Sequence, residues 1–228
     1  MNSSILDHIR ALRRQRRSYM LAALTCLGLG LSLAFAPTLR AQTVLHAPSG
    51  DDLTMIAYAI AGAEPPYAEW ANGLRSVTAL DEFKRAAAAK VAEQRLRTRA
   101  ETVRSTRIIE VNFFAQFGEY NDIYHEFDLS IDDGTVVNFQ SDIHPAGISV
   151  HFNNGGLAQS WPVAHEDAAK ILNLVGGDRS VSVSAKIELG GASIPASGDA
   201  PIEVAGKILE YDVVSPQKRL RLGHVVVH

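Results

Sequence analysis

The chain has 228 residues, of which 46% are hydrophobic and 21% are charged, and its formal net charge is −3 at pH 7. This is the composition of an ordinary globular protein. Without its first 41 residues the chain carries 16 basic and 24 acidic side chains, a net charge of −8, and such an acidic chain is a poor partner for nucleic acid.

The first 41 residues predict an export signal. Five arginines near the terminus precede an uncharged run from Met20 to Ala36 that is rich in Leu and Ala. Cleavage after Ala41 would release the rest of the chain, whereas without cleavage the 17-residue run predicts a single membrane anchor. Arg16-Arg17 also resembles part of a twin-arginine export signal, although an ordinary basic region is the simpler interpretation. We therefore expect a periplasmic protein, with inner-membrane anchoring as the alternative.

Cys26 is the only cysteine, and it lies inside the apolar run. A lipidated cysteine would follow such a run, so we expect no lipid anchor here. Removal of the signal leaves no disulfide and no thiolate chemistry, so the domain must be held together by packing.

Residues 42–104 predict a helical segment. A first helix begins near Asp51-Asp52 and ends at Gly62, and a second short helix follows Pro65-Pro66. Thr78 and Asp81 resemble a capping box, which predicts a long helix from about Ala79 to about Val103. Its apolar residues form two stripes on shifted faces, Leu80, Phe83, Ala87 and Val91 followed by Ala92, Leu96, Ala100 and Val103.

The long helix and the few residues that follow it are rich in arginine. The set is Arg95, Arg97, Arg99, Arg104 and Arg107. One interpretation is a docking face for an acidic partner or an anionic membrane surface. The other is a solvated face, because pairs such as Glu93–Arg97 stand four residues apart and offset each other's charge.

Residues 105–228 predict a β-rich domain. Alternating apolar residues indicate strands over 109–117 and 123–131, and Gly118–Asn121 is the predicted turn between them. Asp132-Asp133-Gly134 predicts a second hairpin that returns at 136–140. Further strands are expected at 148–152, 181–189, 202–213 and 220–226, and a parity shift next to Gly206 indicates a β-bulge.

Trp161–Leu189 is the stretch around which we expect this domain to be organised. It predicts a helix over 165–175, ended by Gly176-Gly177, and then the strand at 181–189. The predicted fold class is α+β: amino-terminal helices, then an antiparallel β-rich domain with one packed helix. The β-rich domain is either a small barrel of the oligonucleotide/oligosaccharide-binding type or an open, curled sheet.

Three histidines, His125, His144 and His151, are candidate metal ligands, with Asp142 beside His144 in one loop. Their spacing matches no known metal signature. His125 falls on the apolar parity of its predicted strand and His151 on the polar parity of its own, so ordinary structural roles are favoured. No metal, cofactor or catalytic residue is therefore assigned.

Other chemistry-bearing residues also have ordinary interpretations. The carboxylates are Asp122, Glu126, Asp128, Asp132 and Asp133, which strands and turns normally expose. Ser141, Asp142 and His144 suggest a catalytic triad, but nearness in sequence is not triad geometry. We predict that Trp70 and Trp161 lie in the core.

The carboxy-terminal half resembles an uncharacterised family of exported bacterial proteins, a domain of unknown function, over about residues 108–226. The segments that carry the resemblance are Val150–Asn154, Trp161–Val163, Glu166–Ala168, Gly206–Ile208 and Tyr211–Val213. The resemblance implies export and a β-rich domain, and it implies no catalytic residue.

We expect an exported binding or scaffolding module without catalytic activity, whose long helix spaces the domain from the membrane or pairs with an envelope protein. One alternative is a metal-dependent or hydrolytic enzyme that uses the Asp142/His144 loop. Another is a membrane-anchored component of an envelope assembly. The sequence makes no prediction of oligomeric state.

Overall fold

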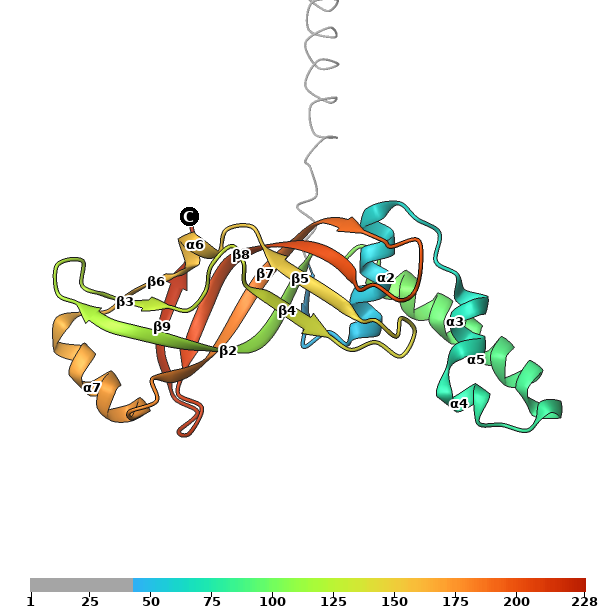
Figure 1. Cartoon of the computed structure of the whole chain (residues 1–228), viewed down its shortest axis with the longest axis horizontal. Coiled ribbons are helices and arrows are strands. Elements are labelled where there is room, and N and C mark those ends of the chain that lie inside the picture. The colour runs from blue at the N-terminus through green and yellow to red at the C-terminus, as the bar shows by residue number, and fades with distance from the viewer. Residues whose placement is uncertain (1–42) are drawn as a thin grey trace, which may run out of the picture. The chain divides into compact units, whose positions relative to one another are not determined.

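The computed structural model of the protein describes residues 43–228. The predicted export signal, with Cys26 and the arginine pair, lies outside the described residues. Gln42–His228 form one compact unit, in which 32% of the described residues are helical and 35% are in strands. The predicted α+β fold is confirmed, with helices followed by a curled sheet that forms a half-barrel (Figure 1).

Nine strands form one sheet within residues 43–228. They are β1 (Val44–His46), β2 (Ile108–Asn121), β3 (Glu126–Leu129), β4 (Val136–Phe139), β5 (Ile148–Phe152), β6 (Ser160–Pro162), β7 (Ser180–Ser193), β8 (Ile202–Val214) and β9 (Arg221–Val226). Their order is β4-β5-β8-β7-β2-β3-β6, with β1 beside β2 and β9 beside β8.

The sheet is mixed rather than purely antiparallel. The pairs β1–β2 and β5–β8 are parallel, and all the others are antiparallel. The chain between the two strands of each parallel pair is long and contains helices, as a crossover between parallel strands requires. The predicted bulge is present in β8 at Leu209, three residues from Gly206, since Lys186 pairs with Glu210 and Ile187 with Ile208.

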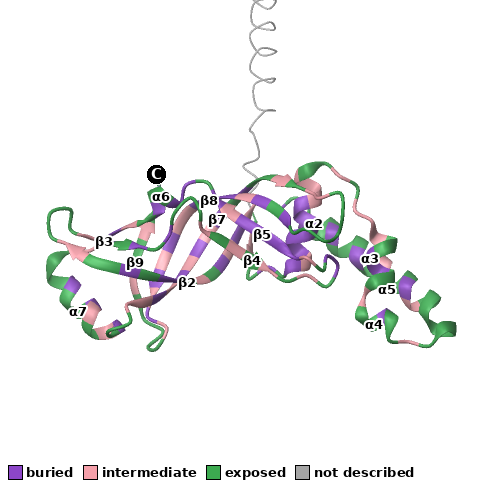
Figure 2. Ribbon diagram, in the orientation of Figure 1, coloured by how far each residue is buried: buried purple, intermediate pink, exposed green. Residues whose placement is uncertain are grey.

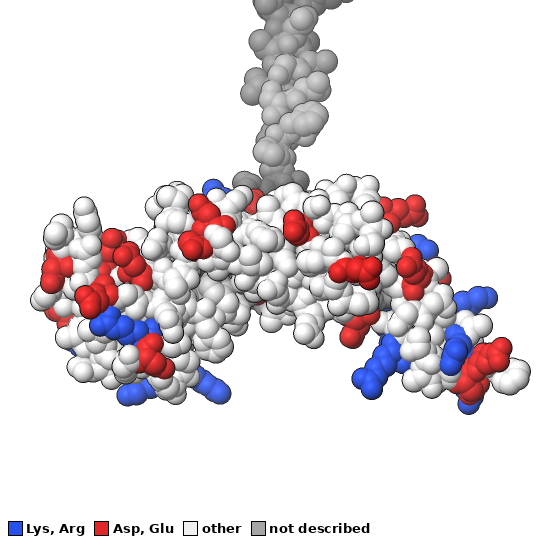
Figure 3. All heavy atoms as spheres, viewed as in Figure 1, with Lys and Arg blue, Asp and Glu red and all other residues white. Residues whose placement is uncertain are grey.

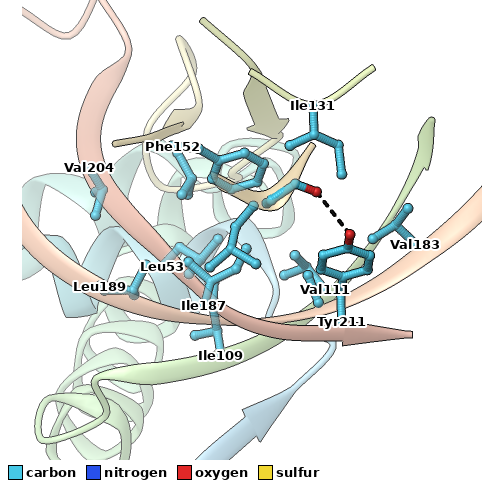
Figure 4. Close-up of a cluster of buried hydrophobic side chains, with 14 of the residues drawn as sticks. Leu53, Ile109, Val111, Ile131, Phe152, Val183, Ile187, Leu189, Val204 and Tyr211 are labelled. Carbon is cyan, nitrogen blue, oxygen red and sulfur yellow. Dashed lines mark hydrogen bonds between the residues drawn. The ribbon is translucent and has the colours of Figure 1, made fainter. Parts of the chain in front are cut away.

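The core lies on the inner face of the curled sheet. Alternate residues of β7 are fully buried there, and they meet the buried residues of β2, β5 and β8 (Figure 4). Tyr211 is 1% exposed, and its hydroxyl donates to the main-chain carbonyls of Ala158 and Ser160. Burial raises the pKa of Tyr211 and keeps its hydroxyl a donor. These hydrogen bonds join β8 to the end of α6 and the start of β6 across the inside of the half-barrel.

Six helices accompany the sheet within the described part of the chain. They are α2 (Gly50–Ala61), α3 (Tyr67–Gly73), α4 (Arg75–Thr78), α5 (Glu82–Val103), α6 (Gly155–Ala158) and α7 (His165–Val175). No helix in residues 43–228 is long and apolar enough to cross a membrane.

Helix α2 packs against the sheet and completes the core. Ser49 caps its first turn by accepting from the main-chain N–H of Asp52, and Gly62 ends it in the left-handed conformation. Leu53 and Ile56 are at most 1% exposed and belong to the same hydrophobic cluster as the strands. Figure 2 shows the buried residues running from the central strands into α2.

Helix α7 confirms the prediction of a helix over residues 165–175. Its buried residues are Ala168, Ile171 and Val175, and it lies at the end of the sheet formed by β3 and the far end of β2 (Figure 1). The sheet is therefore organised differently from the expectation, because the helix that packs on its central strands is α2.

The first predicted hairpin forms, since β2 and β3 pair antiparallel, but its turn is not where we predicted it. β2 continues through Gly118–Asn121, and the turn to β3 comes four residues later, at 122–125. The side chain of Asn121 causes this shift, because its Oδ1 accepts from the main-chain N–H groups of Ile123 and Tyr124.

The turn at Asp132-Asp133-Gly134 forms, but it joins no hairpin. Asp132 Oδ1 accepts from the main-chain N–H of Gly134 at 2.9 Å. The strand that follows, β4, pairs with β5, whereas β3 pairs with β2 and β6. The turn signal is local, and it does not determine which strand the next segment pairs with.

Candidate functional site

Helices α3, α4 and α5, residues 67–104, form what we call the helical arm. In Figure 1 it extends beyond the end of the sheet where α2 lies. Trp70, 6% exposed, packs edge-on between Tyr58 and Tyr67 with ring centroids 5.1 and 5.6 Å away, so it lies in the core as predicted. The guanidinium of Arg97 lies 4.6 Å from the ring centroid of Tyr67 and holds α5 against α3.

A second contact joins the arm to α2. Arg99 donates from Nε and Nη2 to the two carboxylate oxygens of Asp52, at 2.6 and 2.9 Å. Burial alone would raise the pKa of Asp52, but hydrogen bonds from Arg99 and Ser49 together with the charge of Arg99 hold that pKa below its usual value. The same bonds raise the pKa of Arg99. The buried carboxylate therefore stays ionised and fixes the position of α5.

Only one of the two apolar stripes predicted for α5 is covered. Leu96, Ala100 and Val103 are buried, as the second stripe predicts. The first stripe is open, with Phe83 95% and Val91 62% exposed to solvent. This stripe lies on the side of α5 turned away from α2 and α3.

The helix begins later than predicted, at Glu82 rather than at about Ala79. Asp81 is its N-cap and accepts from the main-chain N–H of Lys84, whereas Thr78 ends the separate short helix α4. Because the chain folds α4 back beside α5, a groove forms between the two helices.

The groove between α4 and α5 is the candidate site. It encloses about 390 Å³ and is lined by Ser76 and Val77 of α4 and by Ala87, Ala88, Val91, Ala92 and Arg95 of α5. Five of these seven side chains are apolar. Three of the lining side chains are small alanines, so a larger apolar side chain from outside can enter the groove.

The rim of the groove is basic. Arg75, Lys90 and Arg95 are exposed, and none of the three forms an ion pair with an acidic group in residues 43–228. The arm carries eight basic and five acidic side chains, a net of +3, whereas the remainder of residues 43–228 carries eight basic and nineteen acidic, a net of −11. Figure 3 shows several basic side chains on the arm, with acidic ones among them, and a group of acidic side chains together with some basic ones at the opposite end of the sheet. The groove thus combines apolar walls with a charge opposite to that of its own domain.

The candidate metal ligands do not come together. His125 lies in the β2–β3 turn with φ of 56° and is exposed, so its expected half-buried position in a strand is wrong. His151 lies in β5 and is partly buried rather than fully solvent-facing. His144 is 6% exposed, and its Nε2 lies 2.9 Å from the carbonyl oxygen of Ala200. Among residues 43–228, no three His, Cys, Asp or Glu side chains are placed to hold a metal ion.

Ser141, Asp142 and His144 occupy the loop that docks onto the start of α2. Asp51 Oδ1 accepts from the Ser141 hydroxyl at 2.7 Å and from the main-chain N–H of Asp142 at 2.8 Å. Gly50 allows this approach, since a Cβ there would overlap the carbonyl of Gln140. The Ser141 hydroxyl and the His144 ring therefore make contacts that hold the loop in place.

The carboxylates proposed for acid–base chemistry are dispersed. Asp122 pairs with His165 at 2.9 Å, and Asp132 holds its own turn. Glu126 accepts from the Ser160 hydroxyl, and Asp133 accepts from the main-chain N–H of Gly156. Asp128 lies on the exposed side of β3. Trp161, like Trp70, is in the core, at 1% exposure.

Sequence reasoning missed a charged hollow on the outer face of the sheet. It encloses about 380 Å³ over β2, β7, β8 and β9. Lys186 Nζ lies 2.6 Å from Glu210, while Asp212 pairs with Arg221 and His224 at 2.9 and 2.8 Å. The hydrogen bond to Glu210 raises the pKa of Lys186. The polar parity of these strands predicted exposed side chains, but the cross-strand pairing that brings them together depends on register.

The chain matches no family model, no curated protein and no solved structure. The resemblance of residues 108–226 to an exported family therefore stays a prediction, and no residue role is taken from it.

Proposed function

We propose that this protein is an exported scaffolding module of the periplasm, which binds an acidic protein partner through the groove between α4 and α5. The observation that carries the proposal is the open stripe on α5. Phe83 and Val91 occupy positions where a helix normally buries apolar side chains, and in the described part of the chain nothing covers them.

Charge supports the choice of an acidic partner. The rim residues Arg75, Lys90 and Arg95 form no ion pair among residues 43–228, so an acidic partner gains ion pairs without breaking existing ones. The apolar walls would supply the affinity and the rim would supply the orientation. An amphipathic segment with one or two large apolar side chains and flanking carboxylates fits this description.

Photo-crosslinking from inside the groove tests the proposal. We would place a photoreactive amino acid at Ala87 in the full chain, in its native envelope. We expect a discrete protein adduct that is lost when Val91→Asp is added and that weakens in high salt, because surface ion pairs are screened. Thr102, on the exposed side of α5 about 22 Å from Ala87 along the helix, is the control position for the photoreactive group.

The crosslinked peptide decides the outcome. Mass spectrometry should identify a peptide rich in Asp and Glu around an apolar side chain. An adduct to lipid alone, an adduct that survives Val91→Asp, or a peptide without acidic residues would overturn the proposal.

The compartment is tested separately. We expect fractionation to place the protein in the periplasm and amino-terminal sequencing of the exported form to begin at Gln42. A mature form that keeps residues 1–41 would instead support the anchored alternative, and cytoplasmic protein alone would contradict export.

A further inference from the structure

The β2–β3 turn, residues 122–125, carries a second exposed apolar pair. Ile123 is 82% and Tyr124 70% exposed to solvent. In Figure 1 this turn lies beyond the end of the sheet near α7, while the arm lies beyond the other end. This pair and the open stripe on α5 therefore share no residue and belong to different elements.

Hydrogen bonds hold the backbone of this turn in place. Asn121 Oδ1 accepts from the main-chain N–H of Ile123 at 3.0 Å and of Tyr124 at 3.3 Å. Just before it, the Tyr120 hydroxyl donates to the carbonyl of Val163 at 2.8 Å and anchors the end of β2. A turn that is ordered before binding loses less conformational entropy when it binds.

The surroundings of the turn are acidic. Residues 118–128 and 160–170 contain six carboxylates and one lysine, Lys170, which is itself paired with Asp167 at 2.7 Å. One further basic side chain reaches this end of β2, since Arg179 Nη1 donates to the main-chain carbonyl of Gly118. An open hollow of about 500 Å³ lies beside Tyr124, lined also by Pro162, Val163 and Ala164. The turn thus has the two properties expected of the groove's occupant, large apolar side chains and flanking negative charge.

We propose that the occupant of the α4/α5 groove is the β2–β3 turn of a second copy of this chain, which places Ile123 and Tyr124 of one copy between α4 and α5 of the next. The proposal rests on the proposed function, because it names the partner of the same groove. Charge complementarity carries it: the arm has a net charge of +3, and the turn lies in the acidic remainder, of net −11.

This contact is head-to-tail. Each copy keeps a free groove at one end and a free turn at the other, so association continues into a ring or an open filament. A symmetric dimer, in contrast, would use the same surface twice and bring two basic rims together.

Two single substitutions and their mixture test the arrangement. The full chain is purified in the form that the cell exports, and its mass is followed by sedimentation velocity over a concentration series. Val91→Asp blocks the groove, and Tyr124→Asp blocks the turn. We expect each to weaken self-association by about 30-fold or more, because each replaces an apolar side chain at the centre of the contact with a carboxylate that must lose its water to be buried there.

The mixture is the sharpest measurement. Val91→Asp retains a working turn and Tyr124→Asp retains a working groove, so the two variants together should form one 1:1 dimer and nothing larger. Thr102→Asp adds the same charge to α5 away from the groove and should associate like the wild type. Circular dichroism of each variant shows that it is folded, as expected for substitutions at exposed sites.

The outcomes separate this inference from the proposed function. A wild-type chain that stays monomeric, or a mixture that stays monomeric, overturns the second copy as the partner. If the Ala87 crosslink then reaches another acidic envelope protein, the proposed function stands without self-association of this chain. Self-association that survives Val91→Asp would overturn the second copy as occupant, and the Ala87 crosslink would still decide the groove's function.

Discussion

Helices α2 and α5 come from the same amino-terminal segment and touch each other, but they bury their apolar residues differently. Ile56 of α2 is completely buried, and every apolar residue in the first two turns of that helix is covered. Val91 of α5 is 62% exposed, although it belongs to an equally regular apolar stripe. The sheet covers the apolar residues of α2, whereas one of the two apolar stripes of α5 is not covered by any of the described residues. An apolar stripe thus predicts burial without identifying the molecule that provides it.

The largest difference between the two helices should be seen in stability. We expect Ile56→Ala to lower the free energy of unfolding by about 2–5 kcal/mol, since it removes buried methyl groups and leaves a cavity. Val91→Ala should change it by less than about 0.5 kcal/mol, because the side chain is largely in water and alanine favours the helix. Urea denaturation of the two variants measures both values. A comparable loss in both would show that the stripe on α5 is buried in solution.

The core strands were largely predictable from the sequence. β7 alternates without interruption from Val181 to Leu189, and this period of two gives both the element and its buried face. The helix over 165–175 and the bulge in β8 were found in the same way. These features depend on residues close together in the chain.

The pairing of strands and the candidate site were harder to predict from the sequence. Nothing local distinguishes a turn that leads into a hairpin, as after Asn121, from the one at Asp132, which leads to a strand on the other side of the sheet. The groove was missed for a similar reason. The stripe containing Phe83 was recognised, but helices in globular proteins normally bury such stripes, and its exposure depends on where α4 folds.

The ion pair between Arg99 and Asp52 sharpens the comparison, because it joins α5 to α2. Arg99→Ala should cost about 1–3 kcal/mol, the usual contribution of hydrogen bonds to a charged group that loses its partner. Arg104→Ala removes an exposed pair with Glu101 and should cost less than about 1 kcal/mol. Equal effects would mean that Arg99 contributes no more than a surface contact.

The same pair predicts a dependence on pH. Because the pKa of Asp52 is lowered in the folded protein, its stabilisation is fully present above the unfolded pKa of about 3.9 and is lost as the pH falls through the lower folded value. In Arg99→Ala, Asp52 loses the hydrogen bonds and the positive charge of Arg99 that lower its pKa, so this pKa rises. The stability gap between the two proteins should therefore be largest near pH 7 and shrink below about pH 4. A gap that is constant with pH would contradict this account of Asp52.

The smallest expected effect concerns the start of α5, which sets the position of the open stripe. Asp81 caps the helix through the main-chain N–H of Lys84, so Asp81→Ala should cost about 1 kcal/mol and increase hydrogen exchange in the first turns of the arm. Thr78, the cap suggested by sequence, donates only a long 3.4 Å bond within α4, and Thr78→Ala should have less than half of that effect. If Thr78→Ala proved the more damaging, α5 would begin one turn earlier, and the groove between α4 and α5 would close. Because α2 begins at a well-formed capping box and α5 at a single exposed aspartate, the arm is the part of the domain whose geometry is easiest to alter without affecting the core.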